Sequence, residues 1–138
     1  REAEPDSRYV FDIMSRLAGP VTLERVMTAL QSRVRLMRMW ELFFAQYPLV
    51  LCPVSGETPF EQQSDVRSEA DFMRISEAQL TPRALPTLGM PALSVATGAE
   101  GGHPLGVQLV RARFREDVLL AAADAIEAAS PRVEIATP

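Results

Sequence analysis

Lysine is the first residue type that this sequence lacks, because all 14 basic residues among the 138 are arginine. A chain without lysine cannot by itself supply a lysine base, a Schiff-base lysine or the lysine of a P-loop. The sequence also has one cysteine, Cys52, and one histidine, His103. These two residues cannot form an internal disulfide or complete a Cys/His zinc site, so we expect a cytoplasmic protein with no structural metal.

Long apolar runs and a surplus of positive charge are missing as well. The longest apolar runs span only a few residues, whereas a helix needs about twenty to cross a bilayer. Eighteen acidic residues against 14 arginines give a net charge of −4, which disfavours a phosphate-binding surface. We therefore expect a soluble protein that binds neither a membrane nor nucleic acid.

The apolar spacing that is present predicts four helices and three strands. The helices are expected over residues 6–17, 22–47, 69–80 and 115–129, and the strands over 49–52, 92–96 and 105–110. Pro82 and Pro86 are expected to end the third helix. The first strand is apolar throughout and predicts burial on both faces. The glycine-rich link over 97–104 is typical of a hairpin.

These elements predict an α/β fold with a mixed sheet of about three strands flanked by helices. We find no repeat, linker or low-complexity tract, so residues 1–138 are expected to form a single unit. The second helix is roughly 36 Å long, and the first strand is strongly apolar. Both would be better covered in a larger sheet, so we expect this unit to be part of a larger α/β domain.

No self-sufficient active site is visible in the sequence. Cys52 and His103 suggest a Cys/His nucleophile, but Cys52 lies in an apolar run, where a thiol is usually a small buried hydrophobic group. Glu116 and Asp117 are adjacent and are better explained as partners of a helix dipole than as a catalytic dyad. Ser55 follows the end of the first strand, where ligands tend to bind in α/β sheets. No metal-ligand cluster and no cofactor motif is present.

Three ordered segments resemble the amidase signature family. Residues 86–95, Pro-Thr-Leu-Gly-Met-Pro-Ala-Leu-Ser-Val, are similar to its Gly-Leu-Pro-Ala-x-Ser segment. Residues 103–110, His-Pro-Leu-Gly-Val-Gln-Leu-Val, and the alanine-rich helix after them resemble its Leu-Pro-Val-Gly-Val-Gln-Leu strand and closing helix. Residues 47–55 resemble its strand that ends in Thr-Pro-x, with Cys52 in the usual place of the threonine. The resemblance covers residues 20–138, and three motifs in order make it specific.

The resemblance implies membership of an amidohydrolase family and also implies that this chain is inactive alone. The family hydrolyses amides with a Ser/cis-Ser/Lys triad that precedes the matched part. The sequence has no lysine and no Ser-Ser pair, so no triad residue can be assigned to it and the expected catalytic residues are none. We identify the chain as the carboxyl-terminal portion of an amidase-type α/β/α sheet domain whose catalytic portion is absent here.

In the complete enzyme, the segments after Pro53 and around 87–89 are expected to line the pocket for a small amide substrate. The candidate pocket residues are Ser55, Thr87 and Gly89, although for each of them a purely structural role in a turn is an equal alternative. A second function remains open, a non-catalytic α/β module that forms homo-oligomers through uncovered strand edges and apolar surface. A third is an independent Cys52/His103 hydrolase.

Overall fold

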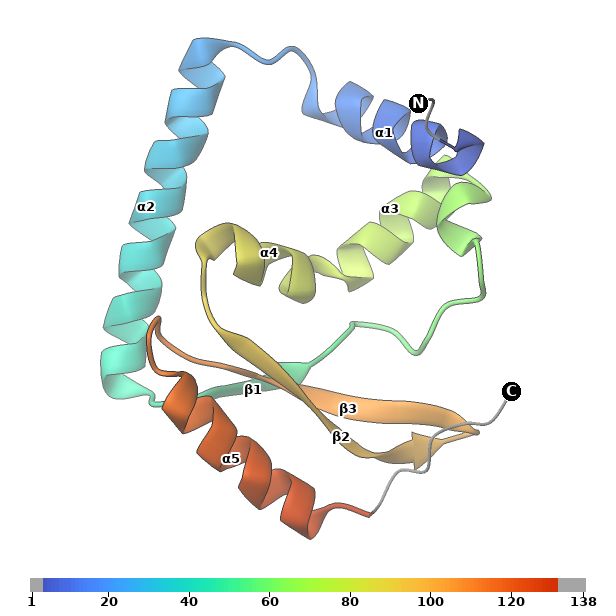
Figure 1. The fold of residues 1–138 in the computed structure, drawn as a ribbon. Coiled ribbons are helices and arrows are strands. Elements are labelled where there is room, and N and C mark those ends of the chain that lie inside the picture. Colours follow the sequence, from blue (N-terminus) through green and yellow to red (C-terminus); the bar gives the residue numbers. More distant parts are fainter. Residues whose placement is uncertain (1–3, 132–138) are drawn as a thin grey trace.

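The computed structural model describes residues 4–131 of the chain (Figure 1). Its elements follow one another as α1 (Pro5–Ala18), α2 (Leu23–Gln46), β1 (Val50–Pro53), η1 (Ser64–Val66), α3 (Glu69–Ala78), α4 (Leu80–Leu88), β2 (Ala92–Glu100), β3 (His103–Val110) and α5 (Glu116–Ala129). The predicted α/β class and the three strands are confirmed.

The sheet has the strand order β1-β3-β2, and β3 pairs antiparallel with both neighbours. The expectation of a mixed sheet is therefore wrong for the strands in this part of the chain. The hairpin between β2 and β3 is confirmed, but its strands extend into the predicted link and leave only Gly101 and Gly102 as the turn. Both glycines have positive φ angles, of 57° and 81°, which favour glycine.

Helices cover both faces of the sheet. On one face, Leu119 and Ala123 of α5 pack on Val95 and Leu109 of the sheet. On the other face, Phe44 of α2 and Leu85 of α4 pack on Val110. The alternation of side chains along β3 explains both layers, because neighbouring residues such as Leu109 and Val110 point to opposite faces. Figure 1 shows α5 on one side of the strands and α4 and the end of α2 on the other.

The prediction that residues 49–52 form a strand buried on both faces is wrong. The strand β1 lies at the edge of the sheet and pairs only with β3. Val50 and Cys52 are half-buried, whereas Leu51 is 60% exposed. An apolar side chain on an edge strand has no neighbour on its open side, so its composition alone did not fix its burial.

The two prolines do not end the helical region, contrary to expectation. The helix α3 ends at Ala78, and a separate helix, α4, begins at Leu80 and contains both Pro82 and Pro86. Pro82 lies in the first turn of α4, where a backbone N–H has no partner within the helix. Pro86 removes one further hydrogen bond, a loss that α4 sustains while its Leu85 is buried in the core.

The turn between the first two helices is fixed by polar contacts at its ends. Gly19 ends α1 with a φ of 65°, and Thr22 accepts a hydrogen bond from the Arg25 backbone N–H as the N-cap of α2. The Arg25 side chain donates hydrogen bonds to the carbonyl oxygens of Ala18, at 2.7 Å, and Pro20, at 2.6 Å. These contacts orient α2, which reaches the sheet only at its far end, where Phe44 is buried.

Candidate functional site

The largest concave site among the described residues is a pocket of about 670 Å³ at the carboxyl end of β1. One wall is the segment that follows β1, and the other walls come from the middle of β2 and the start of β3. The lining residues are Pro53, Val54, Ser55, Gly56, Glu57, Thr58, Pro59, Phe60, Ser94, Val95, Ala96, Thr97, Pro104, Leu105 and Gly106. They are mainly small or apolar and carry hydroxyl groups from serine and threonine. We call this site the β1 pocket.

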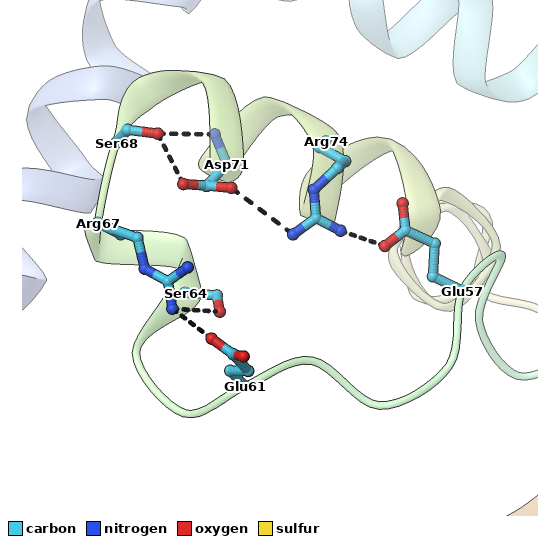
Figure 2. Close-up of polar contacts among 7 residues, drawn as sticks. All are labelled: Glu57, Glu61, Ser64, Arg67, Ser68, Asp71 and Arg74. Carbon is cyan, nitrogen blue, oxygen red and sulfur yellow. Dashed lines mark hydrogen bonds and ion pairs between the residues drawn. The ribbon is translucent and has the colours of Figure 1, made fainter.

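The segment over 54–60 is held in place by α3. The backbone N–H of Gly56 donates a hydrogen bond to the carbonyl oxygen of Ala78, at 2.8 Å. The Glu57 carboxylate forms an ion pair with Arg74 of α3, which also lies 3.7 Å from Asp71 (Figure 2). Because Arg74 neutralises Glu57, the pocket wall presents no free carboxylate at this position.

A second ion pair fixes the remainder of the segment before α3. Arg67 donates a hydrogen bond to the Glu61 carboxylate at 2.6 Å and contacts the Ser64 hydroxyl at 3.5 Å, as Figure 2 shows. The Glu61 carboxylate raises the pKa of Arg67 above its usual value, chiefly through this hydrogen bond. The N-cap of α3 is Ser68, which accepts a hydrogen bond from the Asp71 backbone N–H and donates one to its carboxylate. The pocket wall thus has a defined conformation although it contains no helix or strand.

A close approach of two strands forms the floor of the β1 pocket. A Cβ atom built on Gly106 would lie 2.7 Å from the carbonyl oxygen of Val95 in the neighbouring strand. That distance is shorter than a nonbonded contact permits, so only glycine fits without a backbone shift. Gly106 therefore sets the depth of the pocket beside Ala96, its partner in the β2–β3 register.

The three predicted pocket residues do not come together. Ser55 lines the β1 pocket, and its hydroxyl accepts a hydrogen bond from the Glu57 backbone N–H at 3.3 Å. Thr87 and Gly89 lie instead at the end of α4, and neither lines this pocket. The expectation that they form a loop is wrong, because Thr87 is helical and Gly89 is the C-cap, with a φ of 66°. The Thr87 carbonyl accepts a hydrogen bond from the Arg33 side chain at 2.5 Å, which joins α4 to α2.

Cys52 and His103 are too far apart to act together. Cys52 pairs in register with Gln108, which lies five residues along β3 from His103. At about 3.4 Å per residue, this separation is about 17 Å. The Cys52 thiol donates to the carbonyl oxygen of Gln108, and burial raises the pKa of the thiol above its usual value. A neutral thiol with no imidazole beside it is not an activated nucleophile.

The other candidate carboxylates also have structural partners. Arg115 donates two hydrogen bonds to the Asp117 carboxylate, at 2.9 and 3.0 Å, and holds its pKa below the usual value. Asp117 and Glu116 occupy the first turn of α5, as expected for residues that interact with a helix dipole. Across residues 4–131 there is no group of three or more histidine, cysteine, aspartate or glutamate residues placed to hold a metal ion. No helix within the same range is long and apolar enough to cross a membrane.

Sequence reasoning missed most of the β1 pocket. Ser94 was interpreted only as a strand residue and Thr97 as part of a link, yet both line the site. Their signal was present in the small and hydroxyl-bearing residues that recur along β2. That signal had no direction until the register placed β2 beside β3 and the segment after β1.

Comparison with known proteins gives the class to which this fold and pocket belong. No protein-family model matches the chain. The chain is 35% identical over 115 residues to an indoleacetamide hydrolase of Bradyrhizobium japonicum, a match that covers 83% of the chain and 25% of that protein. An indoleacetamide hydrolase of Bradyrhizobium diazoefficiens is 35% identical over 127 residues, or 88% of the chain and 24% of the relative. One component of the glutamyl-tRNA(Gln) amidotransferase of Streptococcus equi subsp. zooepidemicus is 32% identical over 98 residues, or 71% of the chain and 20% of the relative.

These relatives are amidases, and the chain belongs with them in the amidase signature family, where it matches the carboxyl-terminal portion. The resemblance found in the three sequence segments is therefore confirmed. The chain spans about a quarter of the length of the two indoleacetamide hydrolases that it matches.

Proposed function

We propose that this chain is the carboxyl-terminal part of an amidohydrolase that cleaves the C–N bond of a small carboxamide substrate. The observation that carries the proposal is the β1 pocket, which lies in a region matched by amidases and is lined by small, apolar and hydroxyl-bearing residues. In the complete enzyme a Ser/cis-Ser/Lys triad supplies the chemistry, as the family resemblance implies. The chain itself has no lysine and no Ser-Ser pair, so it is inactive alone.

The role of the β1 pocket in this proposal is to select the substrate by shape. A pocket selects through the fit of the bound group and the pairing of its few polar groups. The paired Glu57 leaves the wall without a free carboxylate, and this supports an uncharged substrate group, such as the aromatic group that the name indoleacetamide hydrolase indicates for two relatives. Ser55 is the wall residue that we assign. Thr87 and Gly89 stay predictions for a separate stretch of wall, near α2.

The experiment that tests this role places the chain in a complete amidase. The segment of the Bradyrhizobium japonicum indoleacetamide hydrolase that matches this chain is replaced by the chain, and ammonia release is measured for an aryl and a short aliphatic amide. Ser55→Phe should change the ratio of kcat/KM between these amides by at least about tenfold, since filling a pocket costs about 1–3 kcal/mol. The control, Ser130→Phe, lies at the end of α5, outside the pocket. An unchanged ratio in an active Ser55→Phe enzyme contradicts the assignment.

The isolated chain offers a separate test of inactivity. We expect no release of ammonia from indoleacetamide or glutamine above the rate in buffer. Release that disappears in Cys52→Ala would overturn this part of the proposal and favour an independent Cys52 hydrolase.

A second candidate function is self-association, which the exposed apolar side chains of α2 favour. In this role the isolated chain forms a homo-oligomer through these side chains, because a large apolar patch left in water drives pairing. Light scattering at about 1–100 μM would measure the mass, in a range of concentrations chosen to span about micromolar affinities. A folded monomer throughout contradicts self-association. The cytoplasmic location remains a prediction from the single cysteine.

A further inference from the structure

The helix α2 carries apolar side chains on two opposite sides, and most of them are exposed. An inner row consists of Val26, Met27, Leu30 and Val34, which are 40%, 48%, 49% and 64% exposed. An outer pair consists of Met39 and Leu42, which are 58% and 61% exposed. Phe44 is the one residue of α2 that is buried. A helix that is apolar on all sides is normally covered on all sides.

The direction of each group follows from the helix geometry of about 100° per residue. Phe44 points to the sheet and α4, and the inner row lies within about 100° of that direction. Leu42 points about 160° away from Phe44, toward the opposite side. Figure 1 shows why the inner row is open, since the first half of α2 stands beyond the sheet, away from α5 and the strands. Both sides of the helix therefore need a cover that these residues do not supply.

The total exposed area leads to the same conclusion. The chain exposes 10454 Å², whereas a compact monomer of 15.2 kDa exposes about 7,100 Å². More than about 2,000 Å² of excess remains when the residues outside the described range are counted as extended chain. A standard protein interface buries about 800 Å² on each partner, so the excess corresponds to an obligate interface.

We propose that both sides of α2 are the docking surface for the catalytic portion of the amidase, which inserts against the inner row and also covers the outer pair. This inference rests on the proposed function. The two Bradyrhizobium relatives have about three quarters of their length outside the region matched here, enough chain to wrap a helix. A second copy of this chain fits less well, because a two-fold dimer buries one self-complementary patch, and using two opposite patches head to tail builds an open filament. Self-association of the isolated chain is then a substitute contact that the catalytic portion displaces.

The test is co-expression of this chain with the Bradyrhizobium japonicum indoleacetamide hydrolase from which the matching segment has been deleted. We expect a one-to-one complex by size-exclusion chromatography with light scattering. Leu30→Glu and Leu42→Glu each place one charge on one side of α2 and should each reduce recovery of the complex at least tenfold. The matched control is Gln31→Glu, which adds the same charge at an exposed position next to Leu30 and should leave recovery unchanged. Circular dichroism of each isolated variant checks that the helices are intact.

The outcomes separate the interface from the proposed function. No complex, or a homo-oligomer that persists beside the truncated hydrolase, assigns the surface to a second copy and overturns the interface. Equal recovery of all three variants also overturns it. A complex that forms as expected but releases no ammonia from indoleacetamide supports the interface and counts against the proposed function. Ammonia release with undiminished recovery of both leucine variants retains the function and overturns the interface.

Discussion

Truncation of two leucines that are paired across strands tests the burial pattern of the sheet most directly. Leu51 of β1 and Leu109 of β3 are partners in the register, so they share the same strand environment. Leu109 is fully buried between the sheet and α5, whereas Leu51 is 60% exposed. The two Leu→Ala changes remove the same atoms, and any difference between them reports the covering of each site.

The expected magnitudes follow from burial. Leu109→Ala removes about three carbon groups, which are worth roughly 2.4 kcal/mol in transfer free energy. It also leaves a cavity under α5, so the free energy of unfolding should fall by about 3–4 kcal/mol. Leu51→Ala loses the transfer term only for its covered part and leaves no cavity. The expected loss there is about 1 kcal/mol.

Urea denaturation followed by circular dichroism at 222 nm measures both variants against the parent chain. The experiment is repeated at two protein concentrations, because self-association would cover Leu51 and make the midpoint depend on concentration. A difference below about 1 kcal/mol between the two variants, at a midpoint independent of concentration, would refute the burial argument. Such a result would mean that α5 does not pack on the sheet as described.

Three further predictions concern the pocket and its supports. Gly106→Ala should lower the free energy of unfolding by about 2 kcal/mol, measured by urea denaturation, because its Cβ meets the Val95 carbonyl; no loss would contradict the close approach. Ser68→Ala should cost about 1 kcal/mol in the same assay by removing the N-cap hydrogen bond to Asp71, and Ser68→Thr should restore most of it. Alkylation of Cys52 by iodoacetamide should be slower in the folded chain than in urea at pH 8, because burial raises the pKa of the thiol and lowers its thiolate fraction. The folded rate should still be rising at pH 9.0, whereas a plateau below that pH would contradict the shift.

Local patterns in the sequence were sufficient for most helices and for the hairpin. The spacing over 6–17, 22–47 and 115–129 predicted α1, α2 and α5, because a Gly or Ser/Thr cap and a 3.6-residue period are properties of neighbouring residues. The break between α3 and α4 was missed. Proline was taken as a terminator, whereas Pro82 lies in the first turn of a new helix, where its missing N–H costs nothing.

The candidate site was only partly accessible from the sequence. Ser55 was found because it follows the end of a strand, a position that the local pattern reveals. Ser94, Thr97 and Gly106 were missed, since they lie far along the chain from Ser55 and reach it only through strand pairing. Gly89 and Thr87 were grouped with Ser55 by motif, but the helix α4 carries them to a different part of the molecule.

The sequence alone determined what chemistry this chain lacks and which family it resembles. The absence of lysine excludes a lysine base whatever the fold, and the three ordered motifs indicated the amidase signature family without coordinates. Tertiary structure decided which side chains are covered and which line a pocket, because burial and pocket lining depend on neighbours that are distant in the chain. Leu51 and Leu109 make the distinction concrete, since composition treats them alike and only the position of β1 at the sheet edge leaves one of them exposed.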